Sequence, residues 1–75
     1  MKVVILGAGR VGTSVAENLV SEHNDITVID ANADGLRYLQ DRYDLQVIHG
    51  DGTQVSVLRA AGLDDADLFI ACAAR

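Results

Sequence analysis

The 75-residue chain has no proline and no tryptophan, one cysteine, and only two tyrosines and one phenylalanine. A single cysteine excludes an internal disulfide framework, and the scarcity of aromatic residues means that any core must be aliphatic. The longest apolar run, residues 68–74, is far shorter than the ~20 residues that span a bilayer. Because no stretch has the pattern of a targeting segment either, we expect a cytoplasmic protein.

Positive charge is also scarce. Six lysines and arginines stand against eleven acidic residues, which gives a net charge of −5. Such a surface argues against binding to nucleic acid or to anionic membranes, because both need basic patches. An anionic ligand would therefore have to be held by a local positive site, and no nucleic-acid partner is expected.

Short apolar runs alternate with stretches of helical periodicity along the chain. In the first of these stretches, Val11, Val15 and Leu19 recur at helical spacing beside Ala16 and Val20. Thr53 is a candidate N-cap for the third helix, and Gly62 suits its end. The pattern predicts strands over 2–6, 26–29, 45–48 and 68–73, and helices over about 10–22, 34–43 and 53–61.

Apolar strands without alternation indicate a parallel sheet that is covered by helices on both faces. With right-handed crossovers, the expected α/β fold is a Rossmann-like doubly wound sheet with strand order 3-2-1-4 and three helices. A full domain of this kind has about six strands, and the run at 68–74 would be an uncovered edge strand. We therefore expect residues 1–75 to be one partial domain of a longer chain, and we expect it to form a homo-oligomer.

A glycine-rich loop, Gly7-Ala8-Gly9-Arg10-Val11-Gly12, joins the first strand to the first helix. In this G-x-G-x-x-G pattern the first glycine permits a tight turn, the second lets the backbone approach a pyrophosphate, and the third allows close packing of helix on strand. A cation at a helix N-terminus is unfavourable by about 0.3–1 kcal/mol, so Arg10 fits best beside a bound diphosphate, although a solvent-facing arginine is the alternative. The loop predicts a dinucleotide site.

Acidic residues follow the next two strands. Asp30 ends the second strand, where an acidic side chain accepts hydrogen bonds from an adenosine ribose. It should repel a 2′-phosphate, which favours NAD(H) over NADP(H) but leaves ATP and ADP possible. Asp51 could accept from the adenine amine, while Thr53 either flanks the adenine or only caps its helix.

The remaining polar and reactive residues give weaker signals. Cys72 and Ala73 end the predicted fourth strand, which lies beside the first strand across the crevice. Cys72 has no identifiable base and is interpreted as a small buried residue. His23 and His49 lack a second ligand at metal-site spacing, so no metal is expected, and the acidic residues 64–67 are interpreted as a solvated turn.

Three segments together resemble one family: ILGAGRVGTSVAENL, NDITVIDAN and LQVIHGDGTQVSVLRAAGLDDADLFIA. They are similar to the N-terminal nucleotide-binding domains of the TrkA family of Trk potassium-uptake regulators, which are RCK (or KTN) domains. The GD-x-T segment and the residues after it are more particular than the glycine loop. The resemblance implies that Gly7, Gly9, Arg10 and Val11 line a diphosphate, that Asp30 meets the ribose, that Asp51 and Thr53 flank the adenine, and that Cys72 and Ala73 lie near the far part of the ligand.

The resemblance also implies a function. Members of this family bind NAD(H) or adenine nucleotides and associate as dimers and rings on the cytoplasmic face of a membrane potassium-transport subunit, whose conduction the ligand controls. The alternatives are the cofactor-binding half of an NAD-dependent dehydrogenase and an interaction module without a ligand. No acid–base pair or nucleophile–base pair is identifiable in the chain, and dehydrogenases of this fold do not generally share the segment GDGT…AAGLDDAD. We therefore expect a regulatory module rather than an enzyme.

Overall fold

The fold follows from four short strands, of which the first three each lead into a helix. The computed structural model describes residues 1–20 and 22–72. These residues form β1 (Lys2–Leu6), α1 (Arg10–Val20), β2 (Asp25–Asp30), α2 (Ala33–Arg42), β3 (Gln46–His49), α3 (Val55–Ala60), a short 3-10 helix (Leu63–Asp65) and β4 (Leu68–Ala71).

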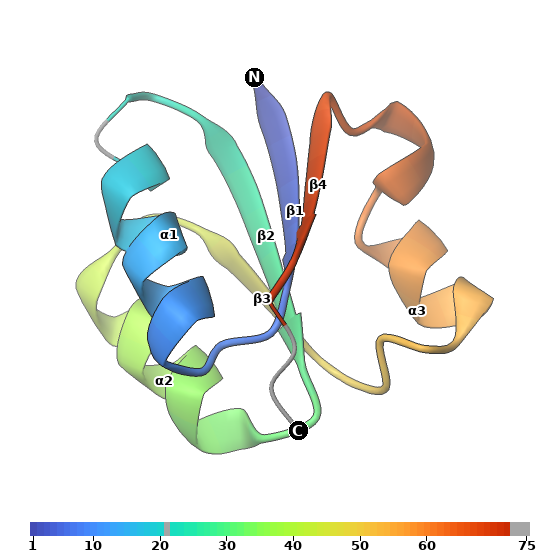
Figure 1. The fold of residues 1–75 in the computed structure, drawn as a ribbon, viewed down its shortest axis with the longest axis horizontal. Coiled ribbons are helices and arrows are strands. Elements are labelled where there is room, and N and C mark those ends of the chain that lie inside the picture. Colours follow the sequence, from blue (N-terminus) through green and yellow to red (C-terminus); the bar gives the residue numbers. More distant parts are fainter. Residues whose placement is uncertain (21, 73–75) are drawn as a thin grey trace.

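The four strands form one parallel sheet in the order β3-β2-β1-β4, which confirms the predicted Rossmann-like arrangement. Helices α1 and α2 cover one face of the sheet and α3 covers the other (Figure 1). The register places Val4 of β1 beside Thr27 of β2 and Phe69 of β4. Because all strands run the same way, the loops that follow them gather at one edge of the sheet.

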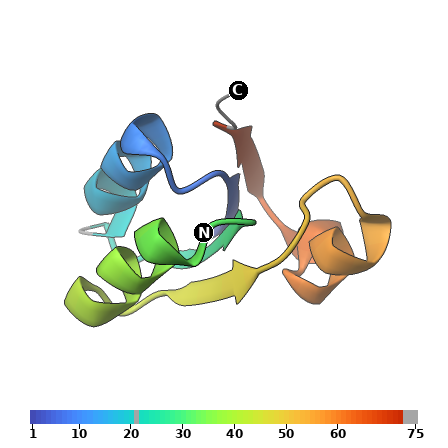
Figure 2. The same cartoon turned by 90° about the horizontal axis from the view of Figure 1, so that it is seen from below.

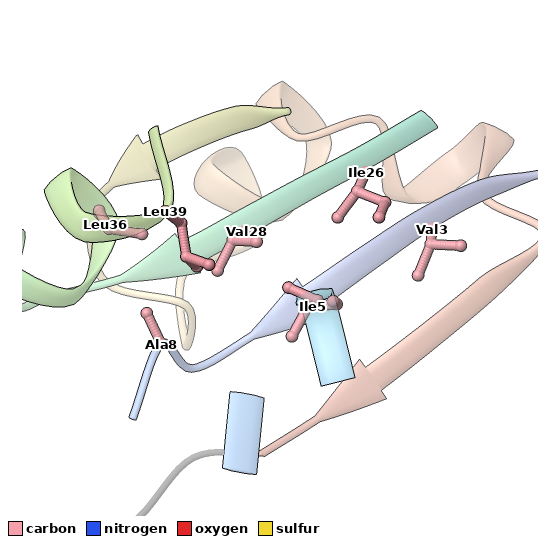
Figure 3. Close-up of a cluster of buried hydrophobic side chains, with 8 residues drawn as sticks. Val3, Ile5, Ala8, Ile26, Val28, Leu36 and Leu39 are labelled. Atoms are coloured by element: carbon pink, nitrogen blue, oxygen red, sulfur yellow. The ribbon is translucent and has the colours of Figure 1, made fainter. Parts of the chain in front are cut away.

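Two aliphatic clusters stabilise the sheet. On the face under α1 and α2, alternate residues of β1 and β2 pack against Leu36 and Leu39 of α2 (Figure 3). On the opposite face, Val4 and Ile29 pack against Ala61, which follows α3. The two central strands are therefore buried on both faces, as predicted. The outer strands are partly exposed, and Phe69 in β4 is 41% exposed.

The apolar residues at helical spacing in α1 indicate its buried side only in part, because Val11, the first of them, is 62% exposed. The buried residues of α1 are Gly12 and Ala16, which are four positions apart and so lie on the same side of the helix. The first turn of α1 packs through the backbone of a glycine, which contributes nothing to a pattern of apolar side chains. Val11 lies one position earlier and points away from the sheet.

The segment between α3 and β4 is more ordered than the predicted solvated turn. Gly62 has a φ of 86° and stops α3 in the left-handed conformation, which confirms the predicted helix stop. The 3-10 helix follows, and the carboxylate of Asp67 accepts a hydrogen bond of 2.8 Å from the backbone N–H of Lys2. Asp67 thus fixes the start of β1 rather than facing only water.

In the described part of the chain, no helix is long and apolar enough to cross a membrane.

Candidate functional site

A cavity of about 390 Å³ opens at the edge of the sheet where β1, β2 and β3 end. Figure 2 shows the molecule from this end, with the loops that follow the strands lying between α1 and α2 on one side and α3 on the other. Ligands of open α/β sheets bind in this position. Five residues that the sequence singled out line it: Gly7, Gly9, Asp30, Asp51 and Thr53.

Gly7 and Gly12 are required by the fold itself. Gly7 has a φ of 112° and its N–H donates to the carbonyl of Ile29 at 2.7 Å, which fixes the turn after β1. A Cβ atom on Gly12 would overlap the carbonyl oxygen of Gly7. The absent side chain of Gly12 therefore lets α1 rest directly on the backbone of the loop.

Gly9 is different, because no contact with residues 1–20 or 22–72 requires a glycine there. Its φ is outside the left-handed region, and a Cβ atom added to it would lie more than 4 Å from every described residue other than its chain neighbours. Gly9 lines the cavity, and its carbonyl accepts the first backbone hydrogen bond of α1, from Thr13 at 2.9 Å. The first N–H groups of a helix have no intrahelical partner. The open space at Gly9 thus fits a group that approaches the backbone closely and accepts these hydrogen bonds.

The first turn of α1 carries positive charge that no described residue neutralises. It contains no acidic residue, and the side chain of the exposed Arg10 forms no hydrogen bond or ion pair within residues 1–20 and 22–72. Helix N-termini favour anions through the helix dipole and the free N–H groups. Arg10 and Val11 do not line the cavity but begin the helix at its rim. This end of the cavity fits a diphosphate.

Asp30 connects two of the loops around the cavity. Its Oδ2 accepts a hydrogen bond of 2.5 Å from the N–H of Ala8, and its Oδ1 accepts one of 2.8 Å from the N–H of Asn32. A carboxylate offers about four lone-pair sites. Asp30 can therefore accept further hydrogen bonds from a pair of ribose hydroxyls while it holds the glycine loop in place.

Sequence reasoning did not single out several residues of the cavity, among them Asn32 and Gly35. Asn32 is the N-cap of α2 and its side chain accepts from the N–H of Asp34 at 2.9 Å. A Cβ atom on Gly35 would overlap the carbonyl oxygen of Ala8, so α2 lies against the glycine loop. A glycine inside a helix lowers stability by about 1 kcal/mol relative to alanine. Its presence in the predicted second helix was therefore a sign that another part of the chain comes close there.

Asp51 and Thr53 form a closed turn on the other side of the cavity. Oδ1 of Asp51 accepts from the N–H of Thr53 at 2.9 Å and from its hydroxyl at 2.7 Å. These bonds, the hydroxyl bond foremost, hold the pKa of the Asp51 carboxyl below its ordinary value of 3.8. Asp51 is therefore ionised at neutral pH and presents acceptor oxygens to the cavity.

The prediction that Thr53 caps the third helix was wrong. The N-cap of α3 is Gln54, whose side chain makes no capping hydrogen bond, and the helix begins at Val55. The hydroxyl of Thr53 is engaged by Asp51 instead. An aspartate two residues earlier competes for the N–H and hydroxyl of the threonine, because such side chains readily close local turns.

Cys72 lies beside the first turn of α1 rather than in the lining of the cavity. Strand β4 ends at Ala71, earlier than predicted, and the N–H of Cys72 still donates to the carbonyl of Leu6 at 2.7 Å. The half-buried Cys72 packs against the larger aliphatic cluster. Ala73 is outside the described residues.

Within residues 1–20 and 22–72, no group of three or more histidine, cysteine or acidic side chains is placed to hold a metal ion.

Comparison with known proteins gives a consistent result. The sequence profile of the TrkA-N domain family matches residues 3–75. The chain is 58% identical over 71 residues to the Trk system potassium uptake protein TrkA of Vibrio alginolyticus, which covers 95% of the chain and 16% of that protein. It is 54% identical over 74 residues to the Haemophilus influenzae protein of the same name (99% and 16%). A TrkA homolog of Pyrococcus abyssi is 40% identical over 75 residues (100% and 33%).

The chain thus spans about a sixth of the length of the Vibrio alginolyticus and Haemophilus influenzae proteins. The family match, by contrast, covers all but the first two residues of the chain. It agrees with the resemblance that the glycine loop and the GD-x-T segment indicated. The chain belongs to the TrkA-N domain family.

Proposed function

We propose that this chain is the nucleotide-binding regulatory module of a potassium uptake system. It binds NAD(H) or an adenine nucleotide, ATP or ADP, in the cavity at the ends of β1, β2 and β3. The observation that carries this proposal is the space at Gly9. A glycine that the fold does not need, next to a helix N-terminus without acidic residues, is explained by a ligand that occupies the position of a side chain.

The cavity offers groups for each part of such a ligand. The backbone N–H groups around Gly9 and the guanidinium of Arg10 would hold the diphosphate. The carboxylate of Asp30 would accept from the ribose hydroxyls, and Asp51 would accept from the exocyclic amine of adenine. Thr53 keeps Asp51 oriented. The bound nucleotide serves as a signal, and no bond in it is formed or broken.

The names of the relatives support a role in potassium transport, because both proteins are called Trk system potassium uptake proteins. We propose that the partner is a membrane potassium-transport subunit, met at the cytoplasmic face by a homo-oligomer of the regulatory protein, with no part played by nucleic acid. The ligand would contact three loops that follow three different strands. It can therefore favour one arrangement of these loops over another, which is the requirement for a ligand-driven switch.

The proposal is tested by the melting temperature of the chain with NAD⁺, NADH, ADP, ATP and NADP⁺, each in large excess. A ligand at 100 times its dissociation constant stabilises by about 2.7 kcal/mol, which raises the midpoint of a domain this small by several degrees. We expect this rise with at least one of the first four compounds and none with NADP⁺, because Asp30 repels a 2′-phosphate. A rise with NADP⁺ equal to that with NAD⁺ would remove Asp30 from the ribose site. No rise with any compound would contradict the proposal.

A further inference from the structure

The part of the cavity proposed to hold adenosine has two walls that come from different loops. The β2–α2 wall consists of Asp30, Ala31, Asn32 and Gly35, and the β3–α3 wall consists of Asp51, Gly52 and Thr53. Each wall is ordered internally by its own aspartate. The affinity for a ligand held between the walls depends on the distance between them. The contacts that join the walls therefore affect this affinity.

Two hydrogen bonds join the two loops. The N–H of Gly50 donates to the carbonyl of Asp30 at 3.0 Å and continues the pairing of β3 with β2. The second bond links Nε2 of His49 to the carbonyl oxygen of Ala31 at 2.8 Å. A carbonyl can only accept, so Nε2 carries the proton and donates. Among the described residues, this is the side-chain hydrogen bond that links β3, the strand before the β3–α3 wall, to the β2–α2 wall.

His49 has no evident role in the core. It is the last residue of β3, its side chain is exposed, and it belongs to neither aliphatic cluster. It does not line the cavity either. Within the described residues, the one hydrogen bond of its imidazole is with Ala31, a residue of the β2–α2 wall. The sequence suggested only a structural or solvated histidine.

We infer that His49 is a positioning residue of the nucleotide site. Its imidazole holds the carbonyl of Ala31 and thereby fixes the distance between the two walls that receive the adenosine. The inference rests on the proposed function, because it takes this cavity to be the nucleotide site. His49 acts through Ala31 and does not touch the ligand.

Three variants test the inference through the dissociation constant for ADP, measured by calorimetry. His49→Leu removes the donor, and we expect ADP to bind about two- to tenfold more weakly. His49→Gln keeps an N–H donor and is expected to restore the affinity to within about twofold of the parent chain. Gln46→Ala is the matched control, because Gln46 is an exposed residue at the other end of β3 and is expected to leave the affinity unchanged.

A merely structural role for His49 would give a different pattern. His49→Gln would then bind ADP as weakly as His49→Leu, which would overturn the inference. An unchanged ADP affinity in His49→Leu would overturn it as well.

Amide hydrogen exchange of the ligand-free chain tests the link itself, independently of any nucleotide. The N–H groups of Asn32 and Gly50 are bonded within or between the two loops. We expect both to exchange faster in His49→Leu than in the parent chain, while the amides in the middle of α1 are unaffected. If the parent does not bind ADP, NADH or ATP, the proposed function fails whatever the exchange shows. If the parent binds but both amides exchange at the parental rate in His49→Leu, the proposed function stands and the inference about His49 is wrong.

Discussion

Replacing Gly12 with alanine is expected to destabilise the protein by about 1–3 kcal/mol, the usual cost of overpacking a tight contact. The added Cβ would overlap the carbonyl oxygen of Gly7. That oxygen cannot move easily, because Gly7 is held by its bond to Ile29 and by its left-handed conformation. Helix α1 would therefore have to lift from the sheet.

The sign of this effect makes the test informative. In a helix that does not make such a contact, glycine to alanine stabilises by about 1 kcal/mol, so propensity and packing predict opposite results. Urea denaturation of the parent and Gly12→Ala chains measures the difference directly. Ser14→Ala is a suitable control on the exposed side of α1. An increase in stability for Gly12→Ala would show that α1 does not rest on the glycine loop.

Replacing Gly9 with valine is expected to weaken nucleotide binding while the fold is kept, whereas the change at Gly12 lowers the stability of the fold. Apart from its chain neighbours, no residue in the described part of the chain has an atom within 4 Å of the position of its Cβ, so the cost in stability is that of a poorer helix N-cap, less than about 1 kcal/mol. The branched side chain would occupy the space proposed for the diphosphate. We expect the affinity for NADH and ADP to fall by roughly 5- to 150-fold, which corresponds to about 1–3 kcal/mol.

A graded series strengthens the result for Gly9. Gly9→Ala adds one methyl group and is expected to weaken nucleotide binding less than Gly9→Val does, while both chains melt cooperatively. Calorimetric titration with ADP and a thermal melt of each variant separate the two properties. Equal affinity in the parent and Gly9→Val chains would contradict the assignment of the diphosphate to this loop.

The fold was predictable from the sequence because its signals are local and agree with one another. The apolar strands, the glycine loop and Leu36 and Leu39 at helical spacing each indicate one element, and parallel strands with right-handed connections leave few topologies. The exposure of Val11 has a specific cause. The first turn of α1 packs through Gly12, and a contact made by an absent side chain does not appear in a hydrophobic pattern.

The candidate site was predictable only in part. Gly7, Gly9, Asp30, Asp51 and Thr53 each follow a strand, and strands that run the same way bring the residues that follow them to one edge. Their roles toward a ligand stay predictions. The partners of Gly35 and His49 were not predictable, because both contacts depend on how closely two loops or helices approach in three dimensions. Asn32 caps α2 through a local contact with Asp34, and only its place in the cavity depends on the three-dimensional fold.

A titration of the isotopically labelled chain with ADP, followed by amide resonances in two-dimensional NMR spectra, would show where the nucleotide binds. We expect saturable shifts concentrated in residues 7–12, 30–35 and 50–53, the three loops around the cavity, with little change in the segment from Gly62 to Asp67 at the other end of the sheet. Saturable shifts that centre elsewhere on the molecule, or no shifts with ADP, ATP or NADH, would contradict the proposed nucleotide site.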